Sequence, residues 1–124
     1  MDPHFDGVIF QTHAAELIRR LRRPFPPFRV LDARWRGDYD RGHVPGAVPV
    51  GPDGLTALPP GTSEHTELFV VGSGPRDPGI RRVSLSLRRL GAHRVVELTN
   101  GMEEWQKAGG PLETGGQSGQ DKAA

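Results

Sequence analysis

The sequence contains no cysteine in its 124 residues. This absence excludes disulfide bonds, thiolate zinc sites, iron–sulfur clusters and any cysteine nucleophile within these residues. Long hydrophobic runs are absent as well, because no stretch approaches the roughly 18 apolar residues that a membrane-spanning helix needs. The first residues, MDPHFD, have neither the basic nor the apolar segment of a signal peptide. We therefore expect a cytoplasmic protein that does not associate with a membrane.

An excess of charge of one sign is also lacking. The chain has 16 Lys and Arg against 15 Asp and Glu, which gives a net charge of +1 and no reason to expect a nucleic-acid partner. The five histidines show neither i, i+4 pairing nor a carboxylate at ligand spacing, so we expect no metal site and no other cofactor. Glycine and proline are abundant, at 17 and 12 residues, and predict a folded domain rich in turns.

Hydrophobic patterning predicts alternating strands and helices. The expected strands cover residues 8–10, 28–31, 47–50, 68–71 and 95–98, and the expected helices cover residues 13–22, 36–41, 80–90 and 101–107. Thr12 stands at the N-cap position of the first helix, and Arg88 is expected on a solvated face of the third. This order predicts an α/β domain with a parallel sheet and helices on both faces. The domain is expected to span residues 1–113, followed by a flexible polar C-terminal tail at 114–124.

A Gly/Pro loop at residues 72–79 lies between a buried strand and a helix, where sites form in open α/β sheets. Backbone N–H groups beside a helix N-terminus favour an anion, and an arginine adds a charge-assisted donor. The same residues would serve equally well as a tight turn, because the pattern matches neither a dinucleotide fingerprint nor a P-loop. The candidate anion-binding residues are Gly72, Ser73, Gly74, Arg76, Asp77 and Gly79.

Two other groups of residues have the chemistry for a site. Asp32, Arg34 and Asp38 are expected to form an ion-pair cluster with a structural role, tying a strand to a short helix. Ser73 would need a base to act as a nucleophile, and His43 is the natural candidate. The sequence has no G-x-S-x-G elbow, so we expect Ser73 to be an ordinary loop serine.

Several motifs, in order along the chain, resemble the rhodanese-like domain family. LDAR at 31–34, DY at 38–39 and GHVPGA at 42–47 have the residues and spacing of that family's blocks. Asn100-Gly101 follows where the family usually has two glycines, and then come Trp105 and AGGP at 108–111. The resemblance covers about residues 8–113 and marks these positions as its structural motif: Asp32, Arg34, Asp38, Gly42, His43, Pro45, Gly46 and Trp105.

The resemblance implies a three-layer α/β fold with a five-stranded, mainly parallel sheet flanked by helices. It also implies an activity, because active members carry a cysteine at the start of the loop after the fourth strand. That cysteine takes a sulfane sulfur from a donor such as thiosulfate and passes it on through a persulfide. The equivalent position here lies within Val71, Gly72, Ser73 and Gly74, none of which has the thiolate that sulfur transfer needs.

We therefore expect no enzymatic activity from a rhodanese-like domain that acts as a binding or regulatory module. Its partner would be another protein or a small anion. One alternative is a small oxyanion- or metabolite-binding domain that uses the loop 72–79. Another is a thiosulfate sulfurtransferase whose cysteine was removed from this sequence.

Overall fold

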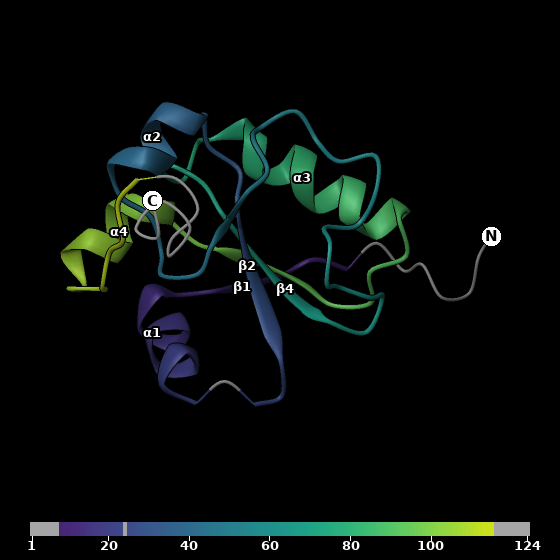
Figure 1. The fold of residues 1–124 in the computed structure, drawn as a ribbon, viewed down its shortest axis with the longest axis horizontal. Helices are drawn as coiled ribbons and strands as arrows, with labels where there is room; N and C mark the ends of the chain where they lie inside the picture. The colour runs from purple at the N-terminus through teal and green to yellow at the C-terminus, as the bar shows by residue number, and fades with distance from the viewer. Residues whose placement is uncertain (1–7, 24, 116–124) are drawn as a thin grey trace, which may run out of the picture.

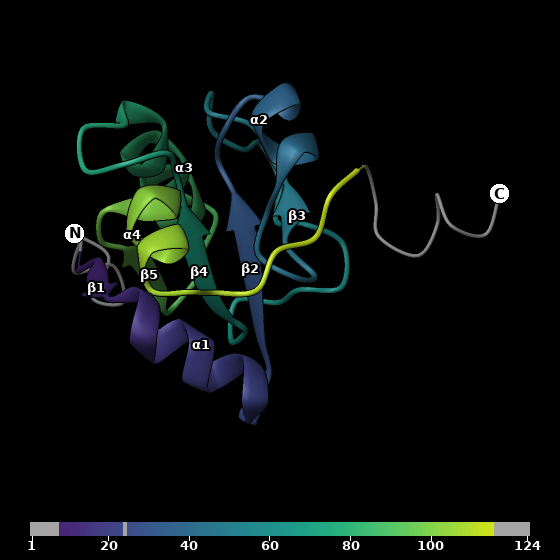
Figure 2. The same cartoon turned by 90° about the vertical axis from the view of Figure 1, so that its left-hand side faces the viewer.

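The computed structural model describes residues 8–23 and 25–115 and contains the predicted parallel sheet. Its strand order is β1-β5-β4-β2-β3, and each neighbouring pair is parallel. Figure 1 gives the whole fold, and Figure 2 shows the five strands in this order from left to right. The elements are β1 (Phe10–Thr12), α1 (Ala14–Arg22), β2 (Phe28–Asp32), α2 (Arg36–Arg41), β3 (Val48–Pro49), β4 (Glu67–Val71), α3 (Pro78–Arg89), β5 (Val95–Leu98) and α4 (Gly101–Lys107).

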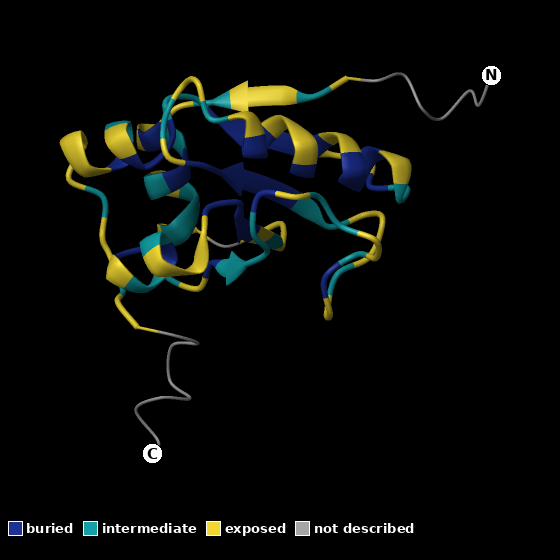
Figure 3. Cartoon of the chain, turned by 90° about the horizontal axis from the view of Figure 1, so that it is seen from above, coloured by how far each residue is buried: buried dark blue, intermediate teal, exposed yellow. Residues whose placement is uncertain are grey.

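Helices cover both faces of the sheet, because side chains along each buried strand alternate between two apolar cores. Phe69 and Val71 of β4 face the core formed with α1, α2 and α4. Leu68 and Val70 of the same strand face the core formed with α3. Figure 1 shows α1 and α3 on opposite sides of the strands, and Figure 3 shows the buried strand residues between the layers. The three-layer α/β fold predicted from the sequence is thereby confirmed.

The beginning of the chain differs from the prediction. The first strand is Phe10–Thr12 instead of residues 8–10, and His13, without a side-chain cap, precedes α1. Thr12 belongs to the strand because it pairs with Leu98 of β5, and its carbonyl accepts the N–H of Thr99 at 2.8 Å. Parallel pairing with a distant strand therefore decides the end of β1, where local sequence suggested a helix cap.

Arg88 was predicted on a solvated face, and that prediction is wrong. Its residue exposure is 5 %, and its guanidinium donates to the carbonyl oxygens of Ala92 and His93 at 3.0 and 2.8 Å. The side chain folds over the turn that follows α3 and satisfies two backbone carbonyls of that turn.

The packed chain continues two residues beyond the predicted domain boundary at 113. His43 and Glu113 exchange backbone hydrogen bonds of 2.9 Å, and the Gly115 N–H donates to the Asp40 carbonyl at 2.7 Å. Figure 2 shows this yellow segment passing across the molecule from α4 toward α2. Residues 116–124 of the predicted tail lie outside the described residues. None of the described helices combines the length and apolar character needed to cross a membrane.

Candidate functional site

The loop 72–79 leaves the carboxyl end of the central strand β4 and leads into α3. It also packs against the start of α4. The Gly72 carbonyl accepts the Met102 N–H at 2.8 Å, and the Ser73 carbonyl accepts the Glu103 N–H at 3.1 Å. Two helices therefore begin at this loop, and the N–H groups that α4 presents there already have acceptors.

The Asp77 carboxylate occupies the inner side of the loop. Its Oδ1 accepts the Gly79 N–H at 2.8 Å, which caps α3, and its Oδ2 accepts the Ser73 N–H at 2.8 Å. The Asp77 N–H in turn donates to the Gly74 carbonyl at 3.1 Å. A carboxylate of the chain itself thus holds two of the amides that an external oxyanion would use.

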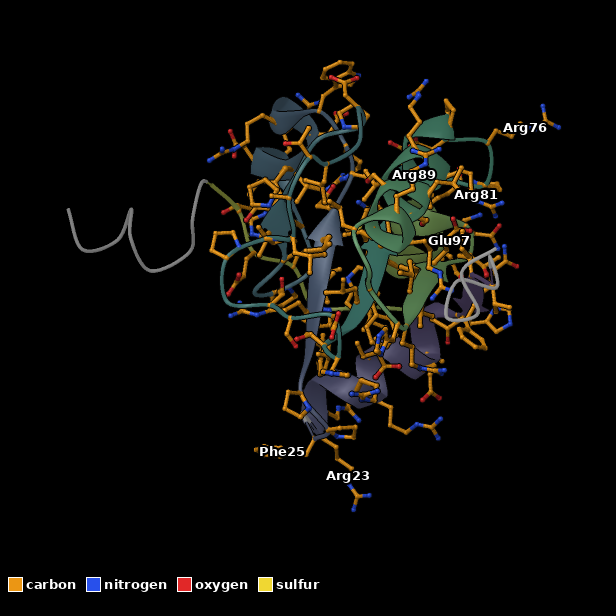
Figure 4. All side chains as sticks on the ribbon, turned by 90° about the vertical axis from the view of Figure 1, so that its right-hand side faces the viewer. Arg23, Phe25, Arg76, Arg81, Arg89 and Glu97 are labelled. Atoms are coloured by element: carbon orange, nitrogen blue, oxygen red, sulfur yellow. The ribbon has the colours of Figure 1, made fainter. Side chains whose placement is uncertain are left out.

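Arg76 is exposed and has neither a hydrogen bond nor an ion pair with the described residues. Figure 4 shows its side chain projecting outward from the loop. The loop therefore presents one free cation to solvent, while its inner amides are bonded to Asp77.

The four positions that correspond to the family's cysteine have different surroundings. Val71 is fully buried in the apolar core. A side chain at Gly72 would collide with Ile80 and approach the Asp77 carboxylate to 2.8 Å. Ser73 is exposed and its hydroxyl makes no hydrogen bond with a described residue, while a side chain at Gly74 would meet open space. Only residues 73 and 74 have room for an accessible side chain.

His43 does not activate Ser73. Its ring is fully buried, stacks on Tyr39 with 3.7 Å between ring centroids, and its Nδ1 lies 2.8 Å from the Tyr39 carbonyl. Its Nε2 lies 3.7 Å from a carboxylate oxygen of Glu113, which also accepts the Gly46 N–H at 3.0 Å. The GHVPGA block therefore fastens the C-terminal segment to the domain.

Trp105, from the same family motif, has a similar role. It is fully buried, and its indole N–H donates to the Pro111 carbonyl at 2.8 Å. A side chain at Gly110 would collide with the indole ring, so this glycine permits the close approach. Trp35 is 65 % exposed, which places it on the rim of the molecule.

Asp32 and Arg34 form a buried ion pair. The guanidinium donates to both carboxylate oxygens, with a shortest distance of 2.7 Å, and also donates to the Gly42 carbonyl at 2.7 Å. Asp38 lies outside this pair, because on α2 it is three residues before Arg41 and forms a surface ion pair with it. The contacts of Asp32 and Arg34 are structural and lead to no exposed acid or base.

A polar cleft of about 190 Å³ beside the loop was not anticipated from the sequence. Glu97 of β5 lines it, is 5 % exposed and accepts two hydrogen bonds from Arg81 at 2.9 and 3.0 Å. Burial raises the pKa of Glu97, but the hydrogen bonds that its carboxylate accepts, chiefly from Arg81, and the charge of Arg81 together outweigh burial and hold that pKa below its ordinary value. A glutamate within the apolar run VVEL is the sequence signal that could have indicated this pair.

No group of three or more His, Asp or Glu side chains within residues 8–23 and 25–115 is arranged to hold a metal ion. The chemistry available at the loop is therefore that of backbone amides, one carboxylate, one serine hydroxyl and one free guanidinium.

Comparison with known proteins decides the family. The sequence model of the family described as "Rhodanese-like domain" matches residues 13–108. This chain belongs to the rhodanese-like domain family. The resemblance read from the LDAR and GHVPGA motifs is confirmed.

Solved structures agree with this assignment. The rhodanese-like domain of Alr3790 from Anabaena has a TM-score of 0.71 at 27 % identity, covering 90 % of this chain and 84 % of that one. BH2092 of Bacillus halodurans has a TM-score of 0.74 at 24 % identity, covering 85 % and 77 %. SseA of Escherichia coli, described as a 3-mercaptopyruvate sulfotransferase with the rhodanese fold, has a TM-score of 0.69 at 24 % identity, covering 88 % and 53 %.

One curated relative carries the name of a sulfurtransferase. SseB of Mycobacterium tuberculosis, whose name describes it as a thiosulfate sulfurtransferase, is 32 % identical over 117 residues. That alignment covers 72 % of this chain, and the chain spans 41 % of the length of SseB. The rhodanese-like domain described here thus shares its family with sulfurtransferases but has no thiol within its 124 residues.

Proposed function

We propose that this rhodanese-like domain is catalytically inactive and works as a binding or regulatory module. The observation that carries the proposal is the state of the loop 72–79. It has no thiol, and Asp77 closes it from within by accepting the Ser73 and Gly79 N–H groups.

Sulfur transfer requires chemistry that these side chains lack. A thiolate attacks the outer sulfur of thiosulfate, the sulfur–sulfur bond breaks, sulfite leaves, and a persulfide remains on the protein. A serine hydroxyl is a harder and far less acidic nucleophile than a thiol, whose pKa is about 8.5, and it cannot hold a persulfide. The Asp77 carboxylate would also repel an anionic donor that approached the loop.

The direct test is a thiosulfate:cyanide sulfurtransferase assay combined with intact-mass spectrometry after exposure to thiosulfate. We expect no turnover above buffer and no mass increase from an added sulfur. Turnover on the order of 1 s⁻¹ or faster, an ordinary enzymatic rate, would overturn the proposal.

A gain-of-function test separates an inactive module from a sulfurtransferase whose cysteine was removed. Ser73→Cys and Gly74→Cys each place a thiol at a position where the structure leaves room. We expect neither variant to turn over thiosulfate, because Asp77 keeps two loop amides and its negative charge disfavours a nearby thiolate. Rapid turnover by either variant would show that the loop is still built for catalysis and that only its nucleophile is missing.

A further inference from the structure

We propose that a groove along the outer face of α3 binds an acidic, leucine-containing segment of a partner protein. This inference rests on the proposed function, because it identifies the surface through which the module would bind. The groove has a volume of about 350 Å³ and lies between α3 and the loop at residues 53–56. Leu55 and Leu85 form the apolar part of the groove, and Arg82 and Arg89 form its charged part.

The wall of the groove is fixed to the helix. The Leu55 N–H donates to the Ser86 hydroxyl at 2.9 Å, and that hydroxyl donates to the Val83 carbonyl at 2.7 Å. Arg82 donates to the Pro52 carbonyl at 3.2 Å. A groove held in this way is already formed before a partner arrives, which lowers the entropy cost of binding.

The apolar part of the groove is accessible. Leu85 is 36 % exposed on the outward face of α3, and Leu55 is half-buried opposite it. Two leucines that line a hollow beside charged side chains differ from the uniformly polar face of a solvated helix. They favour a partner segment that brings an apolar side chain of its own.

Neither arginine of the groove forms an ion pair within residues 8–23 and 25–115. Arg89 has no hydrogen bond or ion pair with a described residue, and Arg82 has only the Pro52 carbonyl. Asp53 is the carboxylate that lines the groove. Arg81, which is next to Arg82 on the same helix, is neutralised by Glu97. Arg76, in the loop before the helix, forms no ion pair with a described residue. Figure 4 shows Arg76, Arg81 and Arg89 on the part of the molecule formed by α3 and the loop before it.

Charge complementarity decides the chemistry of the partner. Arginine presents several N–H donors in a fixed plane and binds carboxylates through two parallel hydrogen bonds. Two unneutralised arginines beside an apolar hollow therefore fit a segment in which Asp or Glu flanks a leucine. Charged groups at such a rim also accelerate association and select against basic partners.

The probe is a short fluorescein-labelled peptide composed of Asp, Glu and Leu, titrated into the full chain and followed by fluorescence anisotropy. Two peptides serve as controls, one with Lys in place of the acids and one with Ser in place of Leu. We expect binding of the acidic leucine peptide alone, with amide chemical-shift changes confined to residues 53–56 and 82–89. Raising the salt concentration from about 50 mM to about 300 mM should weaken that binding, because exposed charges are screened.

A charge-reversed variant with a matched control tests the location. Arg82→Glu with Arg89→Glu should weaken the peptide at least about tenfold, whereas Arg22→Glu with Arg23→Glu should leave the affinity within about twofold. Arg22 and Arg23 are exposed at the end of α1, and their side chains form no hydrogen bond or ion pair with a described residue. Both double variants change the net charge by the same amount. Figure 4 places Arg23 at the opposite end of the molecule from Arg89. Arg89→Glu alone repeats the test without touching the Arg82–Pro52 contact.

Three results would overturn the inference: no binding of the acidic leucine peptide, equal weakening by the two double variants, or shift changes outside the groove. A sulfurtransferase assay on the same preparation distinguishes failure of the groove proposal from failure of the inactive-module proposal. If the protein shows no turnover and does not bind the peptide, the groove proposal is wrong and the inactive-module proposal still stands. An active protein would refute the proposed function itself.

Discussion

Arg34 shows how one side chain can join the end of a strand to the end of the helix that follows it. Its guanidinium joins Asp32 at the end of β2 to the Gly42 carbonyl after α2, and both charged side chains are buried. Removing one member of a buried ion pair leaves the other without compensation, which costs about 3–5 kcal/mol. We therefore expect Arg34→Ala to lower the free energy of unfolding by about 3 kcal/mol in urea denaturation.

Arg89→Ala is the matched control for that measurement, because the Arg89 side chain is exposed and forms no hydrogen bond or ion pair with a described residue. Its effect should stay within about 0.5 kcal/mol. Equal effects of the two substitutions would show that the Asp32–Arg34 pair contributes no more than a surface charge.

Glu97 links the stability of the domain to pH. Its pKa is lowered in the folded state, because the hydrogen bonds to its carboxylate and the charge of Arg81 together more than offset the effect of burial. A carboxylate with a lowered folded pKa stabilises the protein above its unfolded pKa, and this contribution is lost as the pH falls through the folded pKa. We expect Glu97→Gln to destabilise the domain by about 1–2 kcal/mol at neutral pH, since Arg81 is half-exposed and the pair is partly screened.

The difference between the native protein and Glu97→Gln should then shrink as the pH falls below the ordinary glutamate value of 4.5. Thermal denaturation followed by circular dichroism between neutral and acidic pH measures this difference. Glu103→Gln, which removes an exposed carboxylate of α4, is the control for the loss of one negative charge. A constant difference across the whole range would mean that the charge of Glu97 does not contribute.

At the scale of elements, the sequence predicted the parts whose signals are local. Residues 95–98 and 101–107 form β5 and α4 as predicted, because the first is an apolar run interrupted only by Glu97, and the second starts at Gly101 and stops before Gly109. α3 begins at Pro78 instead of residue 80, because Asp77 caps a helix whose first residue is proline. The end of β1 was missed, since its residues acquire strand structure only by pairing with β5.

The candidate loop was located from its sequence, but its inner contacts were not. Asp77 followed by Pro78 is a helix-start signal that fits the bond from the Gly79 N–H, but nothing in the spacing of Ser73 and Asp77 specifies that the carboxylate also accepts the Ser73 N–H. That outcome depends on the loop conformation and on how closely α4 packs against it. The Arg81–Glu97 pair was missed for a similar reason, because it joins residues 16 positions apart on a helix and a strand.

Removing the Asp77 side chain should open the loop to anions. In Asp77→Ala the Ser73 and Gly79 N–H groups lose their acceptor, so sulfate should bind there with millimolar affinity, about −4 kcal/mol. The variant should also be less stable by about 1 kcal/mol, because α3 loses its cap. Amide chemical shifts of residues 72–80 during a sulfate titration measure the binding.

The native protein should respond far less in that titration, since Asp77 competes with sulfate for the same donors. Glu64→Ala is the control, because it removes one exposed negative charge elsewhere. An equally strong response by the native protein would show that the loop binds oxyanions with Asp77 in place, which would favour the oxyanion-binding alternative.

At the scale of the whole molecule, one sheet supports two cores and two different surfaces. The loop 72–79 lies at the carboxyl edge of the sheet, and the α3 groove lies on the outer surface of one helical layer. β4 contributes alternate side chains to both cores, so neither helical layer can lose its packing without affecting the same strand.

This shared strand predicts a single cooperative unfolding transition. Leu17→Ala in the α1 core and Leu87→Ala in the α3 core remove fully buried side chains from opposite faces. Each should cost about 2–5 kcal/mol, the range for a buried leucine replaced by alanine. In both variants, far-ultraviolet circular dichroism and Trp105 fluorescence should report the same urea midpoint. Trp35→Phe in the background removes the exposed indole, so that the fluorescence comes from the α1 core. A Trp105 transition that stays at the native midpoint in Leu87→Ala would show that the two layers unfold independently.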